Sequence, residues 1–342
     1  MGNENRKAYL DKEHRIAIRR EDIPKPGPKD VVVRIQANGI CGSDVHFFKE
    51  GKLGNFIVQE PYLPGHECSG SIAALGSEVQ GFAVDDLVTV EPGIPCGVCA
   101  YCRSGRYNLC KAVVFLSAPP VDGTFCDYLR IRADMVFPIP KRMSFEEAAM
   151  VEPCAVAVQA VNRARFRNGA SGIVVGAGPI GLLTMQAFKA AGGGRVTCVE
   201  MNDFRRAAAK KLGADAVFDP SSGDAELNDS SEVVFETAGA DSATEVLFRY
   251  AAPGGCAVQV GWPRSNLVKM DIARFIEKEL DYVGVNRYAN AYPTAIQWLC
   301  DGRFAVKDLI THTFPFDKVA EAFDFTAKNP GKVIKTVVVN KG

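Results

Sequence analysis

The sequence carries no excess charge of either sign and no long apolar run. Its 40 lysines and arginines balance its 40 aspartates and glutamates, so nothing marks it as a partner for nucleic acid or an anionic surface. No stretch approaches the roughly 20 apolar residues of a membrane span. The start, MGNENRKAYL, lacks the apolar core of a signal peptide. We therefore expect a cytoplasmic protein that binds neither nucleic acid nor membrane.

Cysteine, in contrast, is abundant. The chain has 11 cysteines among its 342 residues, and the number is odd. In a reducing compartment, clustered cysteines are more often metal ligands than disulfides. Four of them fall within residues 96–110, while the others are spread along the chain. We expect most of the dispersed cysteines to be ordinary buried residues.

The sequence changes character near residue 156. The part before it has short β-rich segments bounded by Gly, Pro or Asp, such as VVVRIQANGI and DLVTVEPG, which is typical of a barrel or a folded sheet. The part after it alternates apolar strands, such as SGIVVGAG and RVTCVE, with helical segments. That alternation predicts a parallel sheet with helices on both faces. A chain of this length suits two domains.

A glycine-rich motif, GAGPIG, marks a nucleotide site. It follows the strand GIVV and opens a helix, which is the context that dinucleotide binding requires. The first glycine permits the tight turn, the second lets the pyrophosphate approach the backbone, and the third allows close packing of helix on strand. The helix N-terminus then faces the phosphates. The residues expected to bind the cofactor here are Gly176, Gly178, Pro179, Ile180 and Gly181.

The acidic residue that follows the motif selects the cofactor. Glu200 ends the next strand, close to the spacing of about 20 residues at which an acid binds the adenosine ribose. A carboxylate there accepts hydrogen bonds from the 2′-hydroxyl and repels a 2′-phosphate, so we predict NAD rather than NADP. Arg205 and Arg206 follow closely and leave NADP open. We include Arg205 among the cofactor-binding residues.

The segment CGVCAYCRSGRYNLC predicts a structural metal site. A spacing of two residues brings two cysteine sulfurs onto one metal within a tight turn. Tetrahedral zinc with four thiolates is the favoured interpretation, and the alternatives are an iron–sulfur cluster and a disulfide pair. With all four positions occupied by thiolates, the metal would have no open site for chemistry. The ligands are Cys96, Cys99, Cys102 and Cys110.

Two further stretches, GICGSDVH and YLPGHECSG, predict a second metal site. Cys41, His66 and Glu67 offer a thiolate, an imidazole and a carboxylate, which leaves a fourth position open as catalytic zinc needs. Asp44 could orient His66 by accepting its second ring N–H, and we expect Cys68 to be a bystander. Singly, each residue suits an ordinary structural role. Together, upstream of a nucleotide domain, they favour a metal-dependent redox enzyme.

The whole sequence resembles the zinc-dependent medium-chain dehydrogenases of the alcohol dehydrogenase superfamily, in particular their sorbitol (polyol) dehydrogenase branch. The matching stretches follow the family's order: GICGSDVH, GNFIVQEPYLPGHECSG, GRYNLC, APPVDGTF, EEAAMVEP, GAGPIGLL, NRYANAYPTAI and LITHTFPFDKVAEAF. The resemblance implies an α/β fold. A GroES-like β-barrel catalytic domain would span 1–155, completed by 286–342, and a Rossmann doubly wound parallel-sheet NAD-binding domain would span 156–285. It also implies two zinc ions per chain, one catalytic and one structural, and a homo-oligomer, either a tetramer or a dimer.

The resemblance also assigns roles to single residues. Cys41, His66 and Glu67 match the catalytic-zinc positions of the polyol branch. Glu152 matches a glutamate that binds that metal directly or through its water, and Cys154 we take as core. Ser43 and His46 match the family's proton relay. Substrate positions are matched by Phe47, Phe115, Arg287 and Tyr288, of which Phe47 stands where the family often has tyrosine.

The resemblance predicts an enzyme that oxidises a secondary hydroxyl of a sugar alcohol, such as sorbitol or xylitol, to a ketose by hydride transfer to NAD. One alternative is another zinc dehydrogenase of the superfamily, acting on threonine, butanediol or a simple secondary alcohol. An alternative of a different class is a non-catalytic zinc- and nucleotide-binding structural protein. A metal-free quinone reductase of the same fold is disfavoured, because it would need neither metal cluster.

Overall fold

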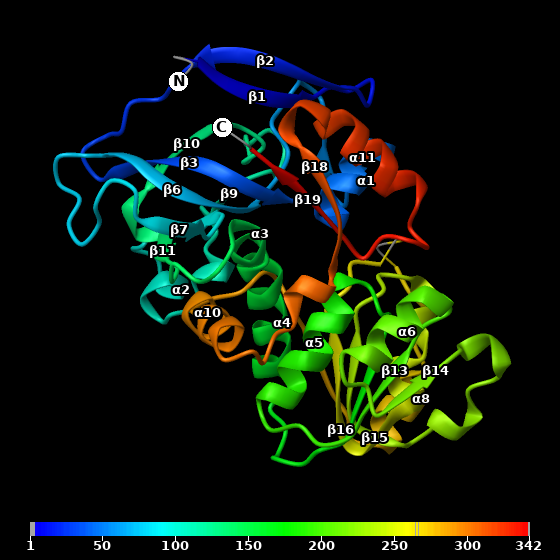
Figure 1. The fold of residues 1–342 in the computed structure, drawn as a ribbon. Helices are drawn as coiled ribbons and strands as arrows, with labels where there is room; N and C mark the ends of the chain where they lie inside the picture. Colours follow the sequence, from blue (N-terminus) through cyan, green and yellow to red (C-terminus); the bar gives the residue numbers. More distant parts are fainter. Residues whose placement is uncertain (1–3, 264, 266, 341–342) are drawn as a thin grey trace. The chain divides into compact units, whose positions relative to one another are not determined.

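The computed structural model describes residues 4–263, 265 and 267–340, and the chain divides into two compact units (Figure 1). Unit 1 is Met1–Glu152 with Val306–Gly342, and unit 2 is Pro153–Ala305. The expected domains placed residues 286–305 with the catalytic part, whereas in the structure this segment groups with unit 2. The backbone N–H of Ala305 donates to Gln186 Oε1 at 2.7 Å, and Arg303 Nη1 donates to the Ala190 carbonyl at 3.1 Å.

A seven-stranded sheet in the order β11-β7-β6-β3-β19-β18, with β10 also pairing with β3, is the centre of unit 1. Its strands are β3 (Asp30–Gly39), β6 (Glu67–Leu75), β7 (Leu87–Val90), β10 (Tyr128–Arg132), β11 (Val136–Pro138), β18 (Ile310–Pro315) and β19 (Lys335–Val339). All neighbours are antiparallel except β18 and β19. Two-stranded ribbons are formed by β1 (Glu4–Leu10) with β2 (Ile16–Asp22), β4 (Lys52–Leu53) with β5 (Phe56–Ile57), and β8 (Gly93–Ile94) with β9 (Val114–Phe115).

Helices complete unit 1 around this sheet. They are α1 (Gly42–Glu50), α2 (Ala100–Arg103), α3 (Phe145–Ala149) and α11 (Val319–Lys328), with the short 3₁₀ turns η1 (Tyr107–Leu109), η2 (Ala133–Met135), η5 (Val306–Asp308) and η6 (Phe316–Lys318). Helix α3 begins with a capping box, since Ser144 Oγ accepts from the Glu147 N–H at 3.2 Å and the Ser144 N–H donates to the Glu147 carboxylate at 3.0 Å.

The last strand of the chain lies inside the unit 1 sheet. β19 pairs with β3 on one side and with β18 on the other, so red β19 runs beside blue β3 in Figure 1. Val337 and Val339 are buried in a cluster with Ala37 and Ala149, and Val338 is buried in another cluster, with Phe316 and Phe323. Gly39 at the end of β3 pairs with both Val337 of β19 and Glu67 of β6. Three strands from distant parts of the sequence therefore meet where β3 ends.

Unit 2 is a doubly wound parallel sheet. Its six strands have the order β14-β13-β12-β15-β16-β17 and all pair in parallel. They are β12 (Gly172–Val175), β13 (Val196–Val199), β14 (Ala216–Phe218), β15 (Ser231–Glu236), β16 (Ala251–Gln259) and β17 (Asp281–Gly284). The order reverses between β12 and β15, and ligands of such sheets bind at the carboxyl ends of the strands at this switch point. The predicted α/β class with a doubly wound sheet is confirmed.

The helices of unit 2 connect these strands. They are α5 (Pro179–Ala190), α6 (Asp203–Lys211), α7 (Asp241–Glu245), α8 (Leu247–Tyr250), α9 (Ile272–Glu277) and α10 (Tyr292–Cys300), with 3₁₀ turns η3 (Pro220–Ser222) and η4 (Ala225–Leu227); α4 (Val151–Ala164) starts in unit 1 and continues into unit 2. Among the described residues, no helix is both long and apolar enough to cross a membrane.

Candidate functional site

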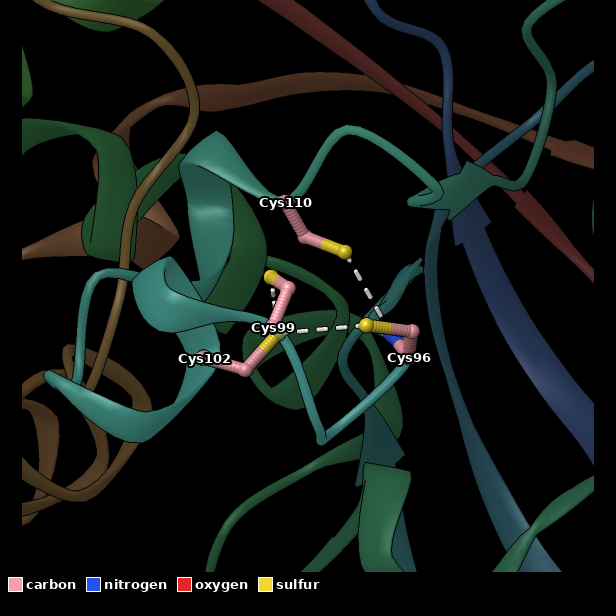
Figure 2. Close-up of side chains that lie close together, drawn as sticks. All are labelled: Cys96, Cys99, Cys102 and Cys110. Carbon is pink, nitrogen blue, oxygen red and sulfur yellow. Dashed lines mark hydrogen bonds between the residues drawn. The ribbon is translucent and has the colours of Figure 1, made fainter.

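The four clustered cysteines gather their sulfur atoms in one place (Figure 2). All four Sγ atoms lie within 4.8 Å of one another, with 3.4 Å between those of Cys99 and Cys102 and 3.9 Å between those of Cys96 and Cys102. Sulfurs on a tetrahedral zinc are about 3.8 Å apart, given Zn–S bonds of ~2.3 Å. The spacing therefore fits one zinc ion. Each of these cysteines is free rather than disulfide-bonded.

Backbone groups prepare this cluster for a metal. N–H groups of Val98 and Cys99 lower the pKa of Cys96 to about 6, because they stabilise its thiolate. The Cys96 N–H itself points at Cys110 Sγ, 3.4 Å away. The lobe is tied to β10, since Arg132 Nη1 donates to the Pro95 carbonyl at 2.9 Å. The backbone therefore favours the thiolate of Cys96 before any metal binds.

The second cluster forms where β3, α1 and β6 meet. Cys41 precedes the first turn of α1 as its N-cap, His66 precedes β6, and Glu67 begins it. Their ligand atoms all lie within 4.8 Å of one another. His66 and Glu67 are 6% and 1% exposed, so a bound ion would be largely removed from water. Gly39 makes room for the carboxylate, because a Cβ there would lie 2.0 Å from Glu67 Oε2.

Asp44, which is fully buried, organises the backbone around this cluster. Its carboxylate accepts from the Cys41 N–H at 3.1 Å, the Gly65 N–H at 3.2 Å and the Ser117 hydroxyl at 2.8 Å. The expected hydrogen bond from His66 is not formed, since Asp44 Oδ1 lies 3.7 Å from His66 Nδ1. Three other donors already occupy the carboxylate. Asp44 thus fixes the segments that carry the ligands rather than the imidazole itself.

The charges around the cluster suit a cation. Burial works to lower the pKa of His66, but the charges of Asp44 and Cys41 outweigh it and raise that pKa well above its usual value. Glu152, itself 4% exposed, acts in the same direction. A pocket that draws a proton onto a buried imidazole also favours a metal ion there. A thiolate, an imidazole and a carboxylate are ligands that zinc accepts, so these residues fit a zinc ion.

Sequence reasoning missed a residue that touches the cluster. Lys335, 3% exposed at the start of β19, donates to Glu67 Oε1 at 2.6 Å and lies 2.5 Å from Oε2. It also donates to the Ile40 carbonyl at 3.1 Å. A signal was present, because the segment VIKTVVV places one lysine in an otherwise apolar strand, and lysines are almost never fully buried unless paired.

Glu152 and Cys68 lie near the cluster without joining it. Glu152 is in the first turn of α4, and its carboxylate is not one of the three groups that gather within 4.8 Å. Burial raises the pKa of Cys68 to about 12, so this thiol stays protonated, as a bystander would. Cys154 is fully buried. The metal role of Glu152 stays a prediction.

The expected relay residues lie on α1. Ser43 is in its first turn and His46 follows one turn later, so the two side chains share a face of the helix. His46 has 41% of its side chain exposed, and its Nδ1 lies 3.4 Å from Glu50 Oε1. Phe47, on the same helix, is 4% exposed and packs edge-on against Tyr62 at 6.1 Å between ring centroids. It sits in a hydrophobic cluster with Leu10 and Val58.

The remaining substrate candidates are in different units. Phe115 of unit 1 lies beside the metal cluster, with its ring centroid 5.6 Å from that of His66. Tyr288 of unit 2 is buried, and its ring centroid lies 5.6 Å from that of Tyr292. Arg287 adopts the left-handed region with φ +55°, and its burial lowers its pKa. Their contact with substrate stays a prediction.

The glycine motif of unit 2 has the geometry that a nucleotide requires. Gly176 follows β12 with φ +96°, a conformation that side chains disfavour. A Cβ at Gly181 would lie 1.9 Å from the Gly176 carbonyl oxygen, so helix and turn pack without room for a methyl group. At Gly178 a Cβ would meet nothing closer than Arg205 Nη1 at 4.0 Å. Gly178 is the N-cap of α5 and Pro179 its first residue, so this open space lies at a helix N-terminus.

Glu200 lies against this turn. One carboxylate oxygen accepts from the Ala177 N–H at 2.7 Å and the other from the Asn202 N–H at 2.9 Å. Of the two nearby arginines, Arg206 is paired with Asp203 and Asp219. The carboxylate is thus held at the position where an adenosine ribose would lie, and these residues fit NAD.

A buried acid of unit 2 is another residue that the sequence analysis did not single out. Glu236 ends β15 with no exposed surface. Its Oε1 accepts from the N–H groups of Ala238 and Gly239, both at 2.8 Å, and its Oε2 accepts from Gln259 Nε2 at 2.7 Å. It therefore shapes the loop that follows β15 at the switch point.

Family models match two parts of the chain. The alcohol dehydrogenase GroES-like domain matches residues 27–141, and the zinc-binding dehydrogenase domain matches residues 179–301. Sorbitol dehydrogenase of Bacillus subtilis (strain 168) is 37% identical over 97% of this chain and 96% of its own length. L-idonate 5-dehydrogenase of Vitis vinifera is 37% identical over 98% of this chain and 95% of its own length.

Solved structures of similar proteins cover nearly the whole chain. An oxidoreductase of unknown specificity from Escherichia coli has a TM-score of 0.94 and 34% identity, covering 99% of this chain and 100% of its own. A zinc-binding dehydrogenase from Sinorhizobium meliloti bound to NADP has a TM-score of 0.90, and an Escherichia coli alcohol dehydrogenase in complex with NADH has one of 0.92. Both are 28% identical and cover 99% of this chain and 100% of their own.

Proposed function

Because this chain belongs to the zinc-dependent medium-chain dehydrogenases, and within them to the polyol branch, we propose that it oxidises a secondary hydroxyl of a sugar alcohol to a ketose with NAD. The observation that supports this most is the buried cluster of Cys41, His66 and Glu67 with the Phe115 ring beside it. Sorbitol and xylitol are the substrates we expect, since both present such a hydroxyl.

The metal and the cofactor would supply the chemistry that side chains lack. A zinc ion held by Cys41, His66 and Glu67 would acidify a substrate hydroxyl, as zinc does for water, whose pKa it lowers to about 7, and NAD would accept the hydride. Glu152 would act at this metal directly or through its water. The Cys96 cluster would hold a second zinc ion that only stabilises its lobe.

Side chains of α1 would remove the proton. Ser43 would accept it from the substrate hydroxyl while its own proton passes on toward His46, one helical turn away. The half-exposed His46 would deliver the proton to water, with Glu50 stabilising the charged imidazole. The support for this path is that both side chains lie on one face of the helix that starts at Cys41.

NAD is proposed over NADP because of Glu200. Its carboxylate is already fixed by two backbone N–H groups, so it could not turn away from a 2′-phosphate without losing both. Arg206 is neutralised by Asp203 and Asp219, which weakens it as a phosphate ligand. Arg205, whose Nη1 lies 4.0 Å from the position that a Cβ on Gly178 would take, could contact the pyrophosphate.

Two further parts of the proposal concern the protein as a whole. We propose a homo-oligomer, a dimer or a tetramer, because β17 is an edge strand of the unit 2 sheet and large apolar side chains near it in sequence are exposed. We also propose the cytoplasm as its compartment, because all its cysteines are free and a reducing environment would keep them so.

The decisive experiment is a substrate panel. NADH formation would be followed with sorbitol, xylitol, ribitol, galactitol, L-idonate, threonine, butanediol and 2-propanol, each with and without prior removal of the labile metal. We expect chelator-sensitive oxidation of one or more sugar alcohols. Activity confined to threonine, butanediol or 2-propanol would keep the zinc chemistry but overturn the polyol assignment, and a metal-loaded protein inactive on all would indicate a structural protein.

A further inference from the structure

A buried ion pair joins the second metal cluster to the last strand of the chain. Lys335 and Glu67 are 268 residues apart in sequence, and their side chains are 3% and 1% exposed. The ammonium nitrogen lies 2.6 Å from Glu67 Oε1 and 2.5 Å from Oε2, so it contacts both oxygens. Buried charges of opposite sign in this geometry interact strongly, since little water screens them.

The position of the ammonium is fixed by the backbone as well. Lys335 Nζ donates to the carbonyl of Ile40 at 3.1 Å, and Ile40 directly precedes the ligand Cys41. The neighbouring backbone is also tied, because the Ile40 N–H donates to the Thr336 carbonyl at 3.0 Å. Lys335 therefore cannot withdraw from the cluster without breaking contacts to both Glu67 and the chain that leads to Cys41.

The Glu67 carboxylate would therefore interact with two cations, the Lys335 ammonium and a bound metal ion. A metal bound by Cys41 and His66 would need a lone pair of the same carboxylate whose two oxygens Lys335 already contacts. The carboxylate already fills the space beside Gly39, where a Cβ would lie 2.0 Å from Oε2. The carboxylate must be shared, and each cation weakens the hold of the other.

We propose that Lys335 is a positioning residue that competes with the metal for Glu67 and so makes Glu67 a weakly held, exchangeable ligand. The proposal rests on the proposed function only in taking Cys41, His66 and Glu67 as the metal site. In the metal-free protein, the ammonium takes the place of the metal charge and keeps Glu67 paired. In the metal-bound protein, it opposes the divalent ion and lowers the barrier to its release.

The test is the rate at which a chromogenic chelator removes zinc from the purified, zinc-loaded enzyme. Lys335→Met removes the competing charge, and we expect its labile zinc to leave at least tenfold more slowly than that of the wild type. Lys335→Arg keeps the charge and is the matched control, with an expected rate within threefold of the wild type. Zinc in the Cys96 cluster is an internal reference whose release should not change.

A double variant shows whether the effect passes through Glu67. In a Glu67→Gln background, Lys335→Met should change the release rate by no more than about twofold, because the shared carboxylate is gone. An equal effect in both backgrounds would mean that Lys335 acts only as a distant charge, and would overturn the proposal. So would unchanged or faster release from Lys335→Met alone.

Thermal unfolding separates this role from simple core packing. Lys335→Met should lower the unfolding midpoint of the metal-free protein more than that of the zinc-loaded protein, since only the former leaves Glu67 without a counter-charge. Equal losses in both forms would indicate a packing role and contradict the proposal. If Lys335→Met does not fold, Lys335→Gln, which is neutral but still a hydrogen-bond donor, takes its place in both measurements.

The proposed function and this inference can fail separately. A wild-type enzyme that binds zinc only at the Cys96 cluster would refute the second metal site and both proposals with it. An enzyme that binds two zinc ions but oxidises no sugar alcohol would refute the polyol assignment alone. Two bound zinc ions with release insensitive to Lys335→Met would refute the inference alone.

Discussion

Gly39 lies at the junction of three strands, opposite Glu67, and its missing side chain is the space that the Glu67 carboxylate fills. Gly39→Ala should displace that carboxylate, and we expect metal analysis to find about one zinc per chain instead of two. The matched control is Gly42→Ala, directly after Cys41, where a Cβ meets no atom within 4 Å. Two zinc ions retained in Gly39→Ala would show that the carboxylate is not needed for binding.

A substitution of Ser43 tests the proposed proton relay. Ser43→Ala removes the hydroxyl but none of the metal ligands, so we expect kcat to fall by about 10²-fold or more, as when a general acid–base group is lost, while zinc content stays unchanged. Ser104→Ala, in the cysteine lobe, serves as the control. Full turnover in Ser43→Ala would remove Ser43 from the mechanism.

Glu91 predicts a pH dependence of stability. This side chain follows β7 and is 2% exposed, and burial raises its pKa to about 7 from the ordinary 4.5. The folded protein therefore holds the proton more tightly than the unfolded chain, so the stability from this group is present below pH ~4.5 and is lost as pH rises toward 7. Glu91→Gln carries no such dependence.

We compare thermal unfolding midpoints. The midpoint of Glu91→Gln should rise relative to that of the wild type as pH increases from 5 to 8. Glu277→Gln, at an exposed position of α9, should follow the wild type throughout. Parallel pH curves for wild type and Glu91→Gln would mean that Glu91 ionises in the fold as freely as in the unfolded chain.

At the scale of elements, we expect cofactor choice to depend on Glu200, which follows β13 and lies against the turn between β12 and α5. Glu200→Ser removes the carboxylate that lies against this turn, and a lost hydrogen bond to a charged group costs about 1.5–3 kcal/mol. We expect kcat/KM for NAD to fall about 10- to 100-fold and the preference for NAD over NADP to shrink. Glu226→Ser, in η4 on the same unit, is the control. An unchanged NAD/NADP ratio would place cofactor selection elsewhere.

Some elements can be predicted from the sequence better than others. The strands and helices of unit 2 follow from local signals, because apolar runs, a glycine turn and Pro179 at the start of α5 lie next to one another in the chain. The same holds for the cysteine lobe, whose spacing alone brings the sulfurs together. The contact between Lys335 and Glu67 depends on the pairing of β19 with β3, which no local pattern reveals. Asp44 shows the same limit, since its partners Gly65 and Ser117 come from other segments.

At the scale of the molecule, one edge of the unit 2 sheet is suited to pairing with a second copy. β17 is the last strand of the sheet, and exposed edge strands readily pair with another chain. The segment around it exposes large apolar side chains: Trp262 56%, Leu267 90%, Ile272 56%, Ile276 66% and Tyr282 41%. Ile272 and Ile276 are one turn apart on α9, so they share a face. Because exposed apolar patches are typical of interaction surfaces, we expect a second copy to bind here.

We expect Ile276→Lys to lower the oligomeric state, because it places a charge in this apolar segment, as measured by light scattering after gel filtration. Val84→Lys introduces the same charge at a site of unit 1 that is 54% exposed and should leave the mass unchanged. A wild-type monomer, or an unaltered oligomer in Ile276→Lys, would rule out this surface as the contact.

The position of β19 has a consequence for biosynthesis. The strand that lies between β3 and β18 follows the whole of unit 2 in the chain, so the sheet of unit 1 stays incomplete until unit 2 has been synthesised. Unit 2, encoded between the two parts of unit 1, has its whole sequence available earlier. Because Lys335 begins β19, Glu67 of the nascent chain lacks its counter-charge until this strand emerges. A prematurely terminated chain would lack that lysine, and its unfinished sheet would expose it to the proteases that remove incomplete proteins.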